Sequence, residues 1–261
     1  MTENTSTAAA TPRPEGAANG HAVGSKPTVV LVHGAFAESG SWDGVITLLQ
    51  DRGYPVVAAG NPLRSPASDA AAVRSLVDHV ARPVVLVGHS YGGSVISQAA
   101  VGAEHVKALV YVGAFLPEVG ESALELTGRF PGSTLPGALD PVHSTGTDGS
   151  TGTDLYIRAD AYHHQFAADV PADVAARMAA TQRPIAQAAL EEAATAAAWK
   201  TVPSWDVVTT EDLNIPVAAQ RFMAERAGAH VTEVAASHAV AASRPDVVAD
   251  VIEQAARHIA G

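Results

Sequence analysis

The segment from residue 83 to residue 104 constrains the fold of this chain more than any other part of the sequence. An apolar, β-branched run, Pro83–Val87, leads into the pentapeptide Gly88-His89-Ser90-Tyr91-Gly92, and a helix-forming stretch, Ser94–Glu104, follows it. The run predicts a buried strand, so the pentapeptide is the turn between a strand and a helix. Gly88 and Gly92 fit a turn in which strand and helix approach too closely for side chains. A G-x-S-x-G turn presents its serine at the end of a strand, which makes Ser90 a candidate nucleophile.

The rest of the chain alternates between apolar runs and stretches with helical spacing. Continuous apolar runs are typical of strands that are buried on both faces. Their alternation with helices predicts the α/β class, with a mainly parallel six-stranded sheet flanked by helices. The predicted strands are Thr28–Val32, Tyr54–Ala59, Pro83–Val87, Val106–Val112, Val202–Thr209 and His230–Val234. The predicted helices are Trp42–Arg52, Ser68–Ala81, Ser94–Glu104 and Pro245–Ala260.

The chain divides into three predicted regions. Residues 1–25 are mostly Ala, Thr, Pro, Gly and Asn without an apolar run, and we expect a flexible tail rather than a signal peptide. Residues 26–116 and 201–261 form the α/β core. Residues 117–200 contain no convincing strand and end in an alanine-rich, helix-forming stretch, so we expect an inserted, mostly helical cap. Ligands bind at the carboxyl ends of strands in such sheets, so the cap is expected to shape the substrate pocket. A purely stabilising insertion is the alternative.

Composition narrows the function classes. A net charge of −11 argues against nucleic acid or a membrane surface as a partner and favours a small-molecule substrate. The absence of cysteine excludes disulfides, thiolate catalysis and zinc-thiolate sites. No run reaches the roughly 18 apolar residues of a membrane helix. We therefore expect a cytoplasmic protein, as a monomer or a homodimer.

Two loops supply partners for the serine. A serine hydroxyl needs a base to take its proton, and that base is most often a histidine held by an acid. Asp212 follows the fifth predicted strand, and His238 follows the sixth within Ala236-Ser237-His238-Ala239. Because the carboxyl ends of parallel strands meet at one edge of a sheet, Ser90, Asp212 and His238 are expected to converge there.

Other acids and histidines of the chain fit these roles less well. Glu211 stays an alternative acid, although the Leu-Asn-Ile-Pro that follows Asp212 favours Asp212. Asp206 lies too early in its strand. His230 begins a strand, at the wrong end. His89, inside the pentapeptide, is expected to pack and to form hydrogen bonds rather than to act as a second base.

Acyl transfer also needs backbone N–H donors that face the developing oxyanion. One donor is expected from Tyr91, the residue after the candidate nucleophile. The other is expected from the loop after the first strand, from Ala35, with Phe36 as the alternative. The candidate pocket residues are Gly34, Phe36, Phe115, Leu116 and His164.

The adjacent pair His163-His164 is the one metal-like feature of the cap. Adjacent side chains on a helix point in different directions, and no HExxH pattern accompanies them. We therefore expect no metal and no cofactor, with these histidines packing the cap or lining the pocket.

Taken together, these segments resemble the α/β-hydrolase superfamily over residues 26–261. The closest likeness is to its small, single-cap branch, which contains plant methyl-ester esterases, hydroxynitrile lyases and related bacterial hydrolases. The segments that carry it are VLVHGAFAESGSW (Val30–Trp42), LVGHSYGG, VGAFLPE, PSWDVVTTEDLNIP, ASHAV and the cap segment HHQFAADV (His163–Val170). The resemblance implies the same triad, Ser90, Asp212 and His238, and the same oxyanion donors, Ala35 and Tyr91.

That branch performs two chemistries, and two positions distinguish them. Its lyases typically carry a threonine after the histidine of the first-strand turn and a lysine after the catalytic histidine. This chain has Gly34 and Ala239 there. The resemblance therefore implies a serine esterase that cleaves a small, mostly apolar carboxylic ester through an acyl-enzyme. A lyase or cyclase-type step, or ligand binding with a relic triad, are the alternatives.

Overall fold

The core of the structure is one parallel sheet. The computed structural model describes residues 26–80, 82–145 and 149–259, so the predicted tail lies outside the described residues. The strands lie in the order β2-β1-β3-β4-β8-β9, and every neighbouring pair is parallel, which confirms the predicted sheet. The bounds are β1 Thr28–Val32, β2 Val56–Ala59, β3 Val84–His89, β4 Val106–Val112, β8 Ser204–Thr209 and β9 His230–Val234.

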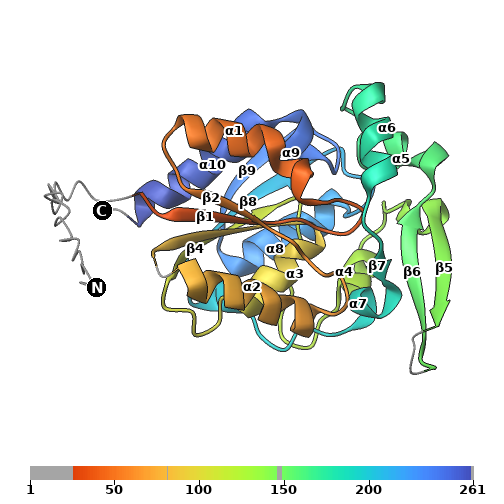
Figure 1. Ribbon diagram of the computed structural model, residues 1–261, viewed down its shortest axis with the longest axis horizontal. Coiled ribbons are helices and arrows are strands. Elements are labelled where there is room, and N and C mark those ends of the chain that lie inside the picture. The colour runs from red at the N-terminus through yellow and green to blue at the C-terminus, as the bar shows by residue number, and fades with distance from the viewer. Residues whose placement is uncertain (1–25, 81, 146–148, 260–261) are drawn as a thin grey trace, which may run out of the picture.

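Helices cover both faces of this sheet because its strands are apolar on both sides. Alternate residues of one strand enter different cores, as Val29 and Val30 of β1 do. Helices α1 and α10 pack on one face, and α2, α3 and α8 pack on the other (Figure 1). The bounds in the core are η1 Ser39–Trp42, α1 Asp43–Asp51, α2 Pro66–Val80, α3 Tyr91–Ala99, α8 Val217–Ala227, α9 Val240–Ser243 and α10 Pro245–His258.

The segment expected to be a mostly helical cap contains strands, so the prediction that it has none is wrong. Strands β5 (Leu139–Thr145), β6 (Thr151–Ile157) and β7 (Ile185–Ala186) form a separate antiparallel sheet. Strand β5 is largely exposed and contains Pro141, so it lacks the buried, alternating pattern that identifies a strand. The helices here are α4 Ala123–Arg129, η2 Leu135–Ala138, α5 Ala159–Phe166, α6 Ala172–Thr181, α7 Gln187–Glu191 and η3 Ala198–Lys200.

The position of this segment fits the expected cap. In Figure 1, α5, α6, β5 and β6 stand together at the end of the molecule opposite the start of β1 and the end of α10. Strand β1 runs from the side where α10 ends towards these elements. The carboxyl ends of the parallel strands therefore face these elements.

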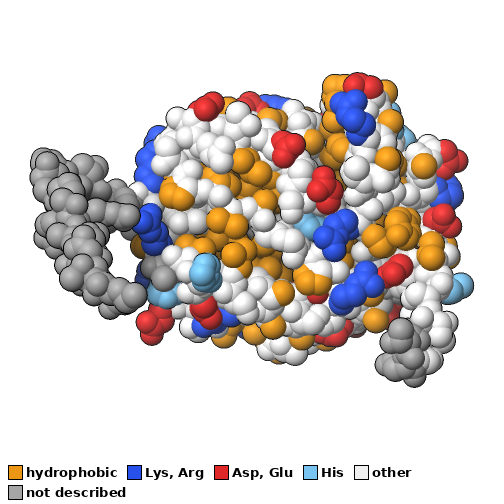
Figure 2. Space-filling view, viewed as in Figure 1, with side chains coloured by type: hydrophobic (Ala, Val, Ile, Leu, Met, Phe, Trp, Pro, Cys, Tyr) orange, Lys and Arg blue, Asp and Glu red, His pale blue; other side chains and the backbone are white. Residues whose placement is uncertain are grey.

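The face of the molecule shown in Figure 2 carries no large patch of Lys and Arg side chains. Acidic and basic side chains are scattered over it (Figure 2), which agrees with the net charge of −11. Among the described residues, no helix is long and apolar enough to cross a membrane.

Asp206 lies inside the sheet, early in β8 and opposite Tyr111 of β4. It is fully buried, and neither carboxylate oxygen has a hydrogen-bond partner within the described part of the chain. Burial raises the pKa of the Asp206 carboxyl well above its usual range. The group is therefore neutral at pH values at which an exposed aspartate is charged.

Replacing Asp206 with asparagine is expected to stabilise the fold at neutral pH. The unfolded chain releases the Asp206 proton near its usual pKa of about 4, whereas the folded chain keeps it. The contribution of the Asp206 proton to the free energy of unfolding is therefore fully present below about pH 4, and it is lost by about 1.4 kcal/mol per pH unit up to the folded-state pKa. Urea unfolding at about pH 4, 6 and 8 measures this. The gain of Asp206→Asn over the wild type should grow with pH, and a pH-independent difference would contradict the assignment.

Candidate active site

Ser90 lies in the turn between β3 and α3. Its backbone has φ 54° and ψ −125°, a conformation that is strained for any residue other than glycine. The turn is tight, since a Cβ atom added to Gly88 would lie 2.6 Å from the carbonyl oxygen of Gly92. The strained turn directs the Ser90 hydroxyl towards His238, with Oγ 2.8 Å from Nε2.

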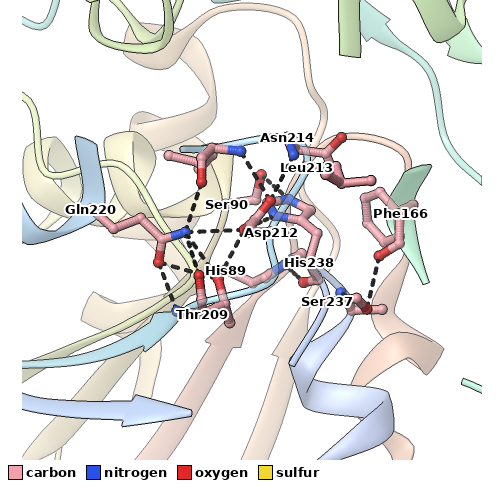
Figure 3. A network of polar contacts seen from close by, with 12 residues as sticks. His89, Ser90, Phe166, Thr209, Asp212, Leu213, Asn214, Gln220, Ser237 and His238 are labelled. Atoms are coloured by element: carbon pink, nitrogen blue, oxygen red, sulfur yellow. Dashed lines mark hydrogen bonds and ion pairs between the residues drawn. The ribbon is translucent and has the colours of Figure 1, made fainter. Parts of the chain in front are cut away.

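His238 links the serine to Asp212. Its Nδ1 lies 2.7 Å from Asp212 Oδ2, and both side chains are almost completely buried (Figure 3). Burial alone would raise the pKa of the Asp212 carboxyl, but the charge of His238 and hydrogen bonds hold it below its usual value. Asp212 is therefore ionised, keeps the proton on Nδ1 and leaves Nε2 free to accept the serine proton. Glu211, the alternative acid, is exposed.

Sequence reasoning missed the groups that hold Asp212. Its Oδ1 accepts the N–H groups of Asn214 (2.7 Å) and Ile215 (3.0 Å). Its Oδ2 accepts the Thr209 hydroxyl (2.9 Å) and the Gln220 side-chain amide (3.1 Å). Gln220 lies in the first turn of α8, eight residues after Asp212, and no motif marks it. These donors fix the carboxylate plane that His238 meets.

His89 supports the same loop without competing as a base. Its Nε2 donates to the carbonyl oxygen of His238 at 2.9 Å, and the two rings lie 4.7 Å apart. Burial, followed by the nearby His238, lowers the pKa of His89 to about 3. A neutral His89 adds no positive charge beside His238, in agreement with its predicted packing role.

The loop after β1 lies beside Ser90. Ala35 and Tyr91 both line the cleft that contains Ser90. Phe36, the alternative donor, has its N–H bonded to the Arg183 carbonyl at 3.0 Å, so its N–H is not free. Tyr162 donates its hydroxyl to the Phe36 carbonyl at 2.8 Å. Two residues of the 117–200 segment thus stabilise Phe36 in its left-handed backbone conformation, φ 59°.

His33 fixes the start of this loop. The Asn61 N–H donates to His33 Nε2 at 3.2 Å, so the Nδ1 atom donates to the Gly34 carbonyl at 2.9 Å. Burial lowers the pKa of His33, which keeps the ring neutral. A Cβ atom at Gly34 would lie 2.6 Å from Ser90 Cβ, so this glycine allows the loop to contact the serine directly.

The cleft over Ser90 has a mostly apolar wall. The candidate pocket residues Phe36 and Phe115 line it. Leu116 does not, because it is buried in the core and its N–H contacts Met223 Sδ. His164 does not either, because it is exposed on α5, whose buried face is formed by Tyr162, Gln165 and Phe166. The wall consists of Ala35, Phe36, Ser90, Tyr91, Phe115, Ala123, Leu124, Thr127, Ser133, Leu135, Pro136, Leu139, Leu190, Asn214, Ile215 and His238.

The adjacent histidines of the cap have separate surroundings. His163 Nε2 bonds to the Val170 carbonyl at 2.9 Å, whereas His164 points to solvent. Within residues 26–80, 82–145 and 149–259, no group of three or more His, Cys, Asp or Glu side chains is placed to hold a metal ion.

A comparison with known protein families decides the identity of this fold. The model of the alpha/beta hydrolase family matches residues 29–251, which is most of the chain. The chain belongs to the alpha/beta hydrolase family. The resemblance stated from its motifs is thereby confirmed.

Relatives of this hydrolase span nearly the whole chain. It is 29% identical to the alpha/beta hydrolase nvfD of Aspergillus novofumigatus, over 88% of this chain and 97% of that protein. It is 28% identical to a pyrethroid hydrolase of Sphingobium wenxiniae, over 86% of this chain and 85% of that one. Its structure is similar to that of polyneuridine aldehyde esterase, with a TM-score of 0.77 and 19% identity over 88% and 98% of the two chains. At 19% identity, the similarity to polyneuridine aldehyde esterase shows a shared fold alone.

The cap segment HHQFAADV holds the histidine loop of this hydrolase. Asp169 accepts the N–H of Ser237 at 3.1 Å and also accepts its hydroxyl. The Phe166 carbonyl accepts the N–H of Ala239 at 2.9 Å, and the Phe166 ring lies edge-on to His238 at 5.0 Å. The residues on both sides of His238 are therefore fixed by this segment, and Figure 3 shows the bond from the Ser237 hydroxyl to the Phe166 carbonyl. The motif was visible in the sequence, but its contact with position 238 was not.

Replacing Asp169 with alanine is expected to lower kcat about 10-fold with little change in KM, because the misplaced histidine slows proton transfer without altering the cleft. Asp169→Asn keeps an acceptor for the Ser237 N–H and should restore most of the rate. Steady-state kinetics of the three proteins measures this. Equal losses in both variants, or a loss confined to KM, would argue against a positioning role.

Proposed function

We propose that this hydrolase is a serine esterase that cleaves uncharged, mostly apolar carboxylic esters through an acyl-enzyme. The observation that carries the proposal is the single chain of contacts Ser90–His238–Asp212 at the wall of an apolar cleft. Among the cleft residues named above, His238 is the one histidine, and no lysine, arginine or carboxylate lines the space. An apolar, uncharged acyl or alcohol group suits such a wall.

The proposed reaction follows from the hydrogen bonds. His238 Nε2 takes the Ser90 proton as Oγ attacks the ester carbonyl, and Asp212 stabilises the imidazolium that forms. His238 then gives the proton to the departing alkoxide, which leaves as the alcohol. Water, activated by the same histidine, releases the acid from Ser90 and restores the hydroxyl.

The oxyanion of the tetrahedral intermediate is assigned to the backbone N–H groups of Ala35 and Tyr91. Both residues line the cleft beside Ser90. Tyr91 begins α3, so its N–H lies at the positive end of that helix. The engagement of the Phe36 N–H with Arg183 supports Ala35 over Phe36 as the second donor.

Two residues favour hydrolysis over lyase chemistry. Position 239 is a buried alanine, so no cation adjoins His238 from that side. Position 34 is glycine, which leaves no side-chain hydroxyl beside the candidate oxyanion hole. The two relatives named above as hydrolases agree with this choice. Their identities of 29% and 28% do not specify the substrate.

Covalent labelling tests the proposal. A fluorophosphonate should form one adduct, which peptide mass spectrometry places on Ser90, and p-nitrophenyl esters of increasing chain length should be hydrolysed with a burst of nitrophenol. Pre-labelled protein is the control and should be inactive. An unlabelled Ser90 together with no turnover of any ester would refute the assignment.

A further inference from the structure

The cleft wall contains one buried hydrogen-bond donor that the triad does not use. Asn214 is 3% exposed and lines the cleft together with Ser90 and His238. Its side-chain Nδ2 has no hydrogen-bond partner within the described residues. A buried donor without a partner is costly, so native structures normally supply one.

The orientation of this amide follows from its neighbours. Gln165 Nε2 donates to the backbone carbonyl of Leu213 at 2.9 Å, and because that oxygen can only accept, the NH₂ end of Gln165 must face this loop. The other end of Gln165, Oε1, accepts the Thr134 hydroxyl at 2.8 Å. The atom of Asn214 that meets Gln165 Nε2 at 2.8 Å is therefore its oxygen. The NH₂ group of Asn214 is left as the unpaired end.

The remaining wall makes this donor selective. The rest of the cleft wall includes apolar side chains such as Phe115, Leu135 and Ile215, and no lysine or arginine lines the cleft that could bind a carboxylate of the substrate. Thr127, another polar residue of the wall, already donates its hydroxyl to the Ala123 carbonyl. A donor fixed in an apolar wall favours ligands that carry a hydrogen-bond acceptor over ligands that lack one, because a ligand without an acceptor leaves the donor unpaired.

We propose that Asn214 Nδ2 donates a hydrogen bond to an uncharged acceptor oxygen of the substrate other than the scissile carbonyl. The hydrolase then prefers apolar esters that carry a ketone, an ether or a second ester oxygen. This inference rests on the proposed esterase function and names its substrate class. The backbone N–H of Asn214, which holds Asp212, is kept when the side chain is replaced.

The experiment compares esters in pairs of equal size. Alkyl alkanoates are matched with oxo-alkanoates that place the ketone at successive positions of the acyl chain, and butyl esters are matched with 2-methoxyethyl esters. Each pair is measured with the wild type, Asn214→Leu and the control Thr127→Val. Dividing variant by wild-type kcat/KM for each ester removes the intrinsic reactivity of that ester.

We expect Asn214→Leu to lower kcat/KM for at least one acceptor-bearing ester about 10-fold more than for its partner, mainly through KM, as the loss of one neutral hydrogen bond predicts. Thr127→Val should change both members of each pair equally. Asn214→Ala repeats the test if the leucine variant has a lowered melting temperature. Equal effects on every pair overturn the inference and leave the esterase intact. Absence of turnover of every ester, with no phosphonate adduct, overturns both.

Discussion

Replacing Ser90 with alanine is expected to lower kcat for ester hydrolysis by about 10⁶-fold while the protein stays folded. In the proposed mechanism, the hydroxyl oxygen is the one atom of the triad that forms a bond to substrate, so no neighbouring group can replace it. Residual turnover would come from the oxyanion donors and the cleft, which remain. Alanine also keeps the backbone free of new contacts, although it retains the strain of the positive φ at this position.

Ser94 provides the matched control for this variant. It lies one turn further along α3, is 4% exposed, and its hydroxyl has no hydrogen-bond partner among the described residues. Ser94→Ala should therefore keep its turnover and its phosphonate adduct, whereas Ser90→Ala loses both. For both variants, mass spectrometry measures the adduct, an ester assay measures turnover, and thermal melts check that the protein is folded. An adduct that persists in Ser90→Ala would place the nucleophile elsewhere.

The central sheet could be predicted because its strands are buried on both faces. Runs such as Val84–Val87 have no polar residue to interrupt them, and their spacing by helices specifies parallel order. The convergence of Ser90, Asp212 and His238 follows from the same rule, since all three come directly after strands of one sheet. In the central sheet, the structure that each local sequence favours is the one that the overall topology requires.

The cap could not be predicted in the same way because its strands and contacts depend on partners distant in sequence. Strand β5 is exposed along most of its length and has no apolar face to signal it. Tyr162 contacts Phe36 across 126 positions, and Gln165 contacts Asn214 across 49. Placing His164 in the pocket failed because α5 buries only one face. Tyr162, Gln165 and Phe166 form that face, and His164 lies on the exposed side.

Replacing Asp212 with asparagine is expected to lower kcat by about 10⁴-fold, because it reverses the tautomer of His238. Each oxygen of Asp212 is surrounded by donors: two backbone N–H groups meet Oδ1, while Gln220 and His238 meet Oδ2. An amide at this position has one NH₂ group that must face donors in either orientation. Facing His238, it forces Nδ1 to accept and moves the ring proton to Nε2, where the serine proton has to go.

Glu211 is the control, because it is an adjacent carboxylate that is exposed and was the alternative acid. Glu211→Gln removes the same charge and should retain kcat within about 2-fold, as a solvated surface charge contributes little. NMR of the imidazole nitrogens should find the Nδ1–H form in the wild type and in Glu211→Gln, and the Nε2–H form in Asp212→Asn. If Glu211→Gln lost activity while Asp212→Asn kept it, the acid would have to be reassigned to Glu211.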